Sequence, residues 1–242
     1  MELDFKGRPD GLGNRIGEII MLTTHGYKNN ITFNYYWNNN NNRNDRKYPL
    51  LLECKNVNIT NRIINTRPSL KINNTLNEKL LYSKLIKPLF NIYFENNIKP
   101  IGIHIRLGDR IGYPEDAGGM TVQYSKNILK KCIIYLNKLI PPYIFICSDN
   151  NNVIEFVKNN INKDIKIIQP FSDSNSPEYT DFFALTLCSK IIMCSKFSSF
   201  PITASLISNC NIITMEKQNN MPEDAHSGSW LESSFIHIDD LL

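Results

Sequence analysis

The stretch Pro100–Arg106, "PIGIHIR", is a β-branched apolar run that ends in polar residues. Isoleucines at every second position favour an extended strand. Successive side chains of a strand point to opposite faces, so His104 and Arg106 share one face. The stretch therefore predicts a buried strand that brings an imidazole and a guanidinium to the same place.

The residues that follow repeat this pattern of apolar strand and helix. Strands are expected at Tyr143–Asp149 and in "IKIIQ", "KIIMC" and "CNIITM", with helices near 124–139, 153–160, 179–188 and 199–207. Apolar strands that alternate with helices indicate a parallel sheet covered on both faces. We expect an α/β fold in which residues 99–242 form a C-terminal Rossmann-like domain with a parallel sheet.

Polar residues gather where three of these strands end. They are His104 with Arg106, Ser148 with Asp149, and the segment "SKFSSF" at Ser195–Phe200. Ligands of open α/β sheets bind beyond the carboxyl ends of the strands. This convergence predicts a ligand site at that edge.

The residue types at this edge suit an anionic ligand. The planar fork of Arg106 can bind two phosphate oxygens. Ser198 or Ser199 begins a helix, where free N–H groups and hydroxyls can cradle a diphosphate. Each residue also has an ordinary interpretation: a surface arginine paired with Asp109, and a plain serine cap.

Residues 1–98 predict a smaller N-terminal α/β domain. A short strand is expected near 3–5, a helix over 14–25, and further strands at Ile31–Trp37 and in "PLLLEC". A helix is also expected from Asn77 to Asn96, interrupted near Pro88 because proline lacks the N–H that a helix needs. The low-complexity run "NNNNNRNDR" is typical of a solvated loop.

The glycine loop "GRPDGLGNRIGEII", Gly7–Ile20, contains Gly11 and Gly13 before Asn14 and Arg15. Its spacing approaches that of a dinucleotide pyrophosphate loop. That fingerprint needs a strand directly before it, and Pro9 cannot donate to a strand ladder. The loop is therefore expected to serve another ligand.

Composition narrows the class of protein. The chain has 242 residues and a net charge of +4, which is too small to indicate nucleic acid as a partner. No apolar run is long enough to span a bilayer, and the first residues carry too many charges for a secretory signal. The chain is expected to be soluble and cytoplasmic. The six cysteines form no C-x-x-C pair and are expected to be buried free thiols, so no metal site is predicted.

Four motifs, in order along the chain, resemble those of the α-1,2-, α-1,6- and protein O-fucosyltransferases. "HIRLGD" resembles their H-x-R-R-x-D motif, with Leu107 in place of the second arginine, and "GLGNR" resembles the G-G-L-G-N-Q loop. "SDN" at Ser148 resembles F-S-D-D. "DFFALTLCSKIIMCSKFSSF", Asp181–Phe200, resembles their last motif, with Phe197-Ser198-Ser199-Phe200 where the α-1,2 enzymes have F-S-W-W.

This resemblance implies a GT-B-like fold and a metal-independent, inverting transfer of fucose from GDP-fucose to a glycan acceptor, with no cofactor. The sequence contains no D-x-D motif, the usual holder of a diphosphate-bound metal in glycosyltransferases. The glycine loop would then face the donor across the cleft. Two other classes stay open: a GDP-sugar-binding protein without catalysis, and an NAD(P)-dependent Rossmann enzyme.

The resemblance also implies roles for individual residues. Arg106 would bind the β-phosphate, and His104 and Asp181 would contact guanine. The general base would be Glu115, by match to the run "DRIGYPEDAGG", with Asp10 and Asp109 as alternatives. The remaining donor contacts expected are Gly11, Gly13, Asn14, Arg15, Ser148, Asp149, Phe197, Ser198 and Ser199.

Overall fold

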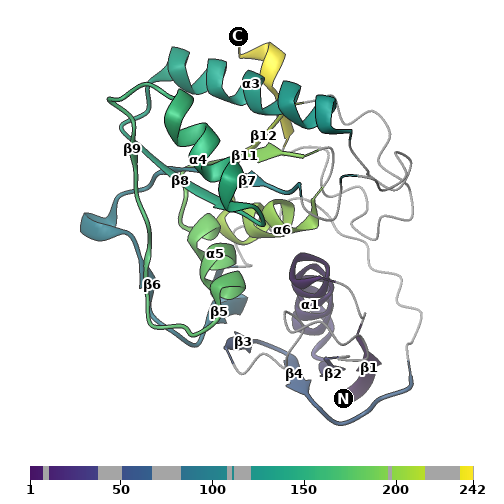
Figure 1. Ribbon diagram of the computed structural model, residues 1–242. Coiled ribbons are helices and arrows are strands. Elements are labelled where there is room, and N and C mark those ends of the chain that lie inside the picture. Colours follow the sequence, from purple (N-terminus) through teal and green to yellow (C-terminus); the bar gives the residue numbers. More distant parts are fainter. Residues whose placement is uncertain are drawn as a thin grey trace.

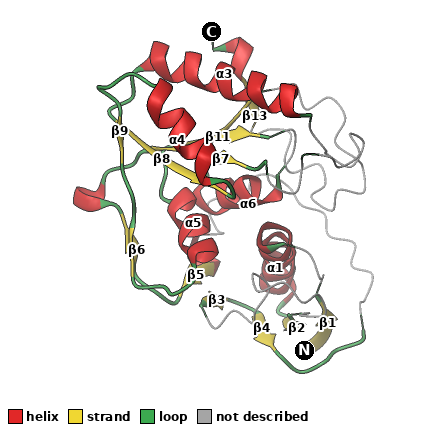
Figure 2. Cartoon of the chain, viewed as in Figure 1, coloured by secondary structure: helices red, strands yellow, loops and turns green. Residues whose placement is uncertain are grey.

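The computed structural model describes residues 1–7, 11–37, 51–66, 83–107, 111, 121–195, 198–215 and 235–241. Figures 1 and 2 show an α/β protein with a large sheet near the C-terminus and a small sheet near the N-terminus. Helix α1 (Leu12–Asn29) lies between the small sheet and helix α6 (Ser199–Ser208).

The large sheet has, among the described residues, six strands that all run parallel. They are β7 (Ile101–Ile105), β8 (Tyr143–Ser148), β9 (Lys166–Ile167), β11 (Lys190–Cys194), β12 (Ile212–Thr214) and β13 (Phe235–His237). Their order is β13-β12-β11-β7-β8-β9. Numbered along the chain within this sheet, the order is 3-2-1-4-5-6 from the other edge, which is that of Rossmann folds. The chain adds β8 and β9 on one side of β7 and then returns to add β11, β12 and β13 on the other side, so the switch point lies between β7 and β11. Ligands of open α/β sheets bind at such a point.

Helices cover both faces of this sheet (Figure 1). Ile103 and Ile105 of β7 face helices α3 (Val122–Leu139) and α4 (Asn151–Asn160). Gly102, on the opposite face, lies against helix α5 (Pro177–Thr186) and Cys188, where a Cβ would come within 2.8 Å of Leu185 and of the Cys188 sulfur. His104 follows Gly102 on the face of α5 and α6, as the alternation of a strand requires.

The small sheet, as far as the chain is described, has three parallel strands in the order β1-β2-β4. They are β1 (Glu2–Lys6), β2 (Thr32–Tyr36) and β4 (Val57–Thr60). Its apolar residues, α1, and the α5–α6 face of the large sheet belong to one hydrophobic core. The division into domains at residue 98 stays a prediction.

Two short antiparallel pairs join these layers. Strand β3 (Leu52–Cys54) pairs with β5 (Ile86–Pro88), and β6 (Ile92–Tyr93) pairs with β10 (Phe171–Ser172). The helix predicted over 77–96 is therefore wrong for 86–93. Pro88 cannot donate an N–H, but it fits an edge strand such as β5. Residues 83–85 are helical, 3₁₀-helix η3 covers Glu95–Asn97, and 77–82 lie outside the described residues.

The expected elements of the C-terminal half are confirmed with small shifts at their ends. Helix α5 begins at Pro177 and not at Tyr179, and β9 is only two residues long. The fold class, α/β with a parallel Rossmann-like sheet, agrees with the prediction. A last 3₁₀-helix, η6 (Ile238–Asp240), packs Ile238 under α3.

Candidate functional site

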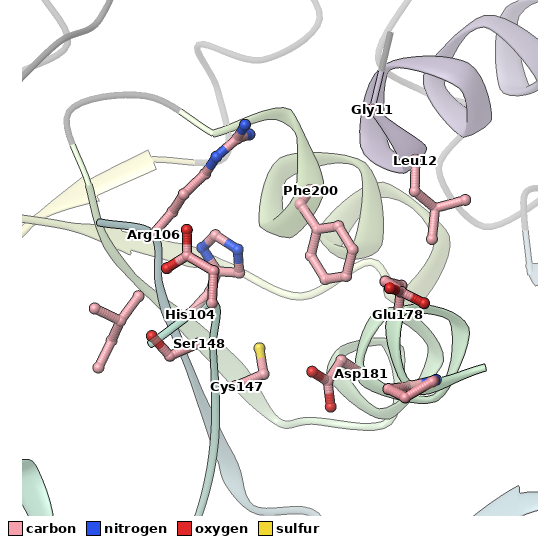
Figure 3. A pocket seen from close by; sticks show the side chains of 12 residues that line it. Gly11, Leu12, His104, Arg106, Cys147, Ser148, Glu178, Asp181 and Phe200 are labelled. Atoms are coloured by element: carbon pink, nitrogen blue, oxygen red, sulfur yellow. The ribbon is translucent and has the colours of Figure 1, made fainter. Parts of the chain in front are cut away.

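A cavity of about 440 Å³ opens at the carboxyl ends of β7 and β8 (Figure 3). The first turns of α1, α5 and α6 close it on the other sides. Its lining residues are Gly11, Leu12, His104, Ile105, Arg106, Cys147, Ser148, Asp149, Pro177, Glu178, Asp181 and Phe200. Phe200 of α6, the helix that follows β11, also lines the cavity, so the cavity borders the switch point between β7 and β11, where the fold predicts a ligand.

The middle of the cavity, called the slot below, is walled by the rings of His104 and Phe200. The His104 ring stacks on Phe200 at 5.3 Å between centroids, and Phe200 meets Phe182 edge to face. Burial, and secondly the charge of Arg106, lower the pKa of His104 to about 3. The imidazole is therefore neutral at physiological pH. Its Nδ1 is buried and has no hydrogen-bond partner among the described residues.

One end of the slot is cationic. Arg106 follows β7 directly, and its guanidinium lies on the side of His104 away from Asp181 (Figure 3). The next residue is anchored, because the Leu107 N–H donates to Asp149 Oδ1 at 3.0 Å. Asp149 thus shapes the end of β7 and so the starting position of the Arg106 side chain.

Two helix N-termini border the cavity. Helix α1 begins at Gly11 and helix α6 at Ser198, and neither has a side-chain cap. The first N–H groups of a helix are not satisfied within it and attract negative charge. Ser198 is fully buried, and its Oγ has no hydrogen-bond partner in the described part of the chain.

The two glycines of the loop have different surroundings. A Cβ at Gly13 would lie 2.5 Å from the Phe200 amide nitrogen, so only glycine lets α1 approach α6 this closely. The Thr203 hydroxyl donates to the Gly13 carbonyl at 3.0 Å and fixes the same contact. A Cβ at Gly11 would meet nothing within 4 Å, because Gly11 borders the cavity.

The other end of the slot is acidic. Glu178 and Asp181 lie three residues apart on α5 and both line the cavity. Burial, and secondly the neighbouring charge of Glu178, raise the pKa of Asp181 to about 6. The Cys147 thiol lies beside Asp181 (Figure 3), and burial raises the pKa of this thiol too. The end opposite Arg106 therefore offers carboxylate acceptors in a partly apolar setting.

The structure brings together Gly11, His104, Arg106, Ser148, Asp149 and Asp181 among the residues expected at the site. Ser148 lines the cavity while its Oγ accepts a hydrogen bond from the Asn150 N–H at 3.1 Å. Gly13, Asn14, Ser198 and Ser199 lie in the adjacent first turns of α1 and α6 and do not line the cavity.

Arg15 lies elsewhere. Its side chain is 0% exposed, and its guanidinium sits 4.6 Å from the centre of the Trp37 ring. On the same helix, the buried Glu18 carboxylate accepts a hydrogen bond from the Tyr35 hydroxyl at 2.8 Å. This position suits a structural role within the N-terminal half better than contact with a ligand in the cavity. Asp10, Asp109, Glu115 and Phe197 lie outside the described residues.

Sequence reasoning did not name several residues that line the cavity: Leu12, Ile105, Cys147, Pro177, Glu178 and Phe200. Glu178 had a usable signal, because it precedes Asp181 by three residues and so shares its helix face. Phe200 directly follows Ser198 and Ser199, which were expected to contact the donor. Cys147 and Pro177 had no signal beyond their neighbours.

Within the described residues, no group of three or more His, Cys, Asp or Glu side chains is arranged to hold a metal ion. Across the same residues, no helix has the length and apolar character to cross a membrane. All six cysteines are free thiols, as predicted, but only four are buried as expected, because Cys54 and Cys210 are partly exposed.

The sequence model of a protein family, glycosyl transferase family 11, matches residues 27–236 of this chain. No curated protein matches the sequence. The structure is similar to fucosyltransferase NodZ from Bradyrhizobium, with 13% identity, a TM-score of 0.56, and 90% of this chain and 96% of that chain covered. It is also similar to NodZ α-1,6-fucosyltransferase soaked with GDP-fucose, with 14% identity, a TM-score of 0.53, and coverage of 94% and 96%. At such identities the likeness concerns the fold, which is GT-B-like, as expected.

Proposed function

Because the chain belongs to glycosyl transferase family 11, and is therefore a glycosyltransferase, we propose that it transfers fucose from GDP-fucose to a glycan acceptor. We further propose that the transfer inverts the anomeric centre and needs no metal ion. The similar fold of a protein whose crystals were soaked with GDP-fucose supports this choice of donor.

The polarity of the cavity is the observation that carries the proposal. Arg106 lies at one end, the stacked His104 and Phe200 rings lie in the middle, and the Asp181 carboxylate lies at the other end, while the uncapped N-termini of α1 and α6 border the cavity. GDP has the matching order of a diphosphate, a flat base, and a base edge with N–H donors. UDP and adenine nucleotides lack the combination of N1–H and exocyclic amino group that a carboxylate can accept together.

The diphosphate would be bound at the cationic end. Arg106 would bind the β-phosphate with two N–H donors, as its planar fork allows. The first turn of α6, with Ser198 and Ser199, and Asn14 in the first turn of α1 would add hydrogen bonds. Gly11 would let the phosphates come close to the start of α1, because no Cβ projects there.

Guanine would occupy the slot between these groups. Asp181 would accept from its N1–H and amino group, and the neutral His104 would contact it through its ring or Nδ1. Cys147 and Phe200 supply the apolar surface on which a base can lie. Ser148 and Asp149 would support this end of the cavity from β8.

In the transfer step, the acceptor oxygen would form a bond to the anomeric carbon of fucose while the bond from that carbon to the β-phosphate oxygen breaks. GDP leaves with an additional negative charge, which preorganised donors can stabilise without a metal ion. Arg106 and the two helix N-termini would be the groups that do so. Removing one such donor in other enzymes costs about 10²–10³ in rate.

A carboxylate would take the proton of the acceptor hydroxyl. We propose Glu115 for this role, with Asp109 and Asp10 as alternatives. Asp149, a described carboxylate of the cavity, already accepts from the Leu107 N–H. Glu178 and Asp181 lie at the end assigned to the nucleoside, away from the expected sugar position.

Thermal unfolding with different nucleotides tests the donor class. GDP and GDP-fucose at millimolar concentration should raise Tm, whereas UDP, ADP and NADPH should not. A larger shift with UDP or NADPH would contradict the proposal. Release of GDP from GDP-fucose with a panel of glycans then tests transfer itself. Binding of GDP without turnover on any of them would favour a GDP-sugar-binding protein.

A further inference from the structure

Glu178 lines the cavity together with the carboxylates of Asp149 and Asp181, and the donor contacts above leave it without a role. It lines the cavity one helical turn before Asp181 and lies next to Leu12 of α1 in Figure 3. It is exposed, whereas Asp181 is partly buried. A ligand held by Asp181 would therefore meet Glu178 at a more open part of the cavity.

The local structure holds Glu178 in place. Pro177 starts α5, where its fixed φ suits the first turn, and Ser176 is the N-cap residue. The Ser176 hydroxyl donates to Glu178 Oε2 at 3.0 Å. The carboxylate thus has a defined position, with further lone pairs free to accept hydrogen bonds.

Two carboxylates this close repel each other, which is one reason why the pKa of Asp181 is raised. Such an arrangement in a cavity suits a ligand that brings several donors. A second feature of the same cavity also points to a ligand: His104 is 7% exposed, and its Nδ1 has no partner among the described residues.

We propose that Glu178 accepts hydrogen bonds from the ribose hydroxyls of the bound nucleotide. This inference rests on the proposed function, which assigns guanine to Asp181 and the diphosphate to Arg106. Ribose joins these two parts, and its hydroxyls are the nucleotide donors that those contacts leave without an acceptor. Carboxylates bind ribose hydroxyls in other nucleotide sites at sheet switch points. Glu178 therefore selects ribonucleotides over deoxyribonucleotides.

Binding of GDP, 2′-deoxy-GDP and 3′-deoxy-GDP, measured by calorimetry, tests this role. A hydrogen bond to a charged group contributes about 1.5–3 kcal/mol, so the wild type should bind GDP about ten- to a hundredfold more tightly than at least one deoxy analogue. In Glu178→Ala that ratio should fall to within about threefold. Glu178→Gln, which keeps a neutral acceptor, should give an intermediate ratio.

Two matched variants separate this role from general damage. Asp181→Asn removes the proposed base contact, so it should weaken all three nucleotides about equally and keep the ratio of the wild type. Glu155→Gln changes an exposed carboxylate on α4 that does not line the cavity, and should leave all affinities unchanged. Thermal unfolding of Glu178→Ala, followed by circular dichroism, would show whether this variant is folded.

The outcomes distinguish the inference from the function on which it rests. No binding of GDP by the folded wild type would overturn both. Binding of GDP with no loss for either deoxy analogue would overturn the role of Glu178 alone. So would a Glu178→Ala variant that keeps the discrimination of the wild type.

Discussion

Replacing the two glycines of the "GLG" segment by alanine should affect different properties: Gly13→Ala should lower stability, and Gly11→Ala should weaken ligand binding. At Gly13 the new Cβ would lie 2.5 Å from the Phe200 amide nitrogen and 2.6 Å from Phe200 Cα, against ordinary contacts of 3.4–4 Å. These are backbone atoms, so no side-chain rotation can relieve the overlap. Helix α1 must move away from α6, and the hydrogen bond from Thr203 to the Gly13 carbonyl is strained or lost.

The size of the effect follows from three contributions. Overpacking costs about 1–3 kcal/mol, and the hydrogen bond is worth about 1 kcal/mol. Alanine is better than glycine within a helix, which offsets up to about 1 kcal/mol. Gly13→Ala should therefore lower the free energy of unfolding by about 1–3 kcal/mol. For a chain of this size that is a fall in Tm of about 2–12 °C.

Gly11→Ala is the matched control. Gly11 has φ −65° and ψ 166°, which alanine adopts without strain, and no atom lies within 4 Å of its Cβ position. Alanine is less favourable than glycine at the N-cap, which lowers stability, but it also reduces the entropy of the unfolded chain, which raises stability. Each effect is below about 1 kcal/mol. Stability should stay within about 1 kcal/mol, while the methyl group occupies space in the cavity and weakens GDP binding about tenfold.

Urea unfolding and calorimetry with GDP measure the two quantities separately. A Gly13→Ala variant as stable as the wild type would refute the close approach of α1 to α6. A Gly11→Ala variant with the GDP affinity of the wild type would show that the donor does not reach the start of α1.

Four further predictions concern the proposed chemistry. Arg106→Ala should lower the transfer rate about 10²–10³-fold, and Arg106→Lys should not restore it because lysine lacks the bidentate fork; a rate within threefold of the wild type would make Arg106 peripheral. Transfer should survive EDTA; loss with EDTA and recovery with magnesium or manganese would contradict a metal-free mechanism. Burial raises the pKa of Asp181 from 3.8 to about 6, so GDP affinity should weaken as the pH falls through 6. Between pH 3.8 and about 6, the Asp181 carboxyl binds more protons in the folded form than in the unfolded form, so its contribution to stability falls as the pH rises. Asp181→Asn should therefore raise the stability of the free protein at pH 7 while lowering its affinity for GDP. Urea unfolding measures the first effect and calorimetry the second. Glu115→Gln should lower turnover about 10²–10⁴-fold with little change in GDP affinity; if steady-state kinetics instead find Asp10→Asn inactive and Glu115→Gln normal, the base lies in the N-terminal half.

The C-terminal half could be predicted from sequence because its signals are local. Ile103 and Ile105 alternate with Gly102 and His104, and strands buried on both faces repeat between clear helices. Since parallel strands end at one edge, the strand pattern alone is enough to place His104, Arg106 and Ser148 at the same edge of the sheet. The order of the strands places β11 beside β7. This order depends on packing between distant segments, so a local sequence pattern does not predict it.

The errors have physical causes as well. The helix predicted over 77–96 includes residues 86–93, yet pairing of β5 with β3 and of β6 with β10 stabilises strands there. Such pairings are non-local, so a window of sequence does not reveal them. Arg15 follows the glycine loop and has the position of a ligand contact, but the helix turns its side chain towards Trp37. The glycine pattern indicates that a side chain is not tolerated at Gly13. It does not indicate that the close approach of α6 excludes that side chain.

The hydrophobic core shared by the two sheets restricts motion of the two halves of the molecule relative to each other. Ile16 and Phe33 from the first sixty residues are fully buried in one cluster with Phe182 and Ile202 from the far end of the chain. A hinge motion that separated the two halves would expose these side chains to water. The free energy of such a wide opening would therefore be close to that of unfolding. Entry of a ligand and its release should then need only small local shifts around the cavity. Heating should melt both sheets in a single cooperative step, and hydrogen exchange should find α1 and α6 protected to the same degree.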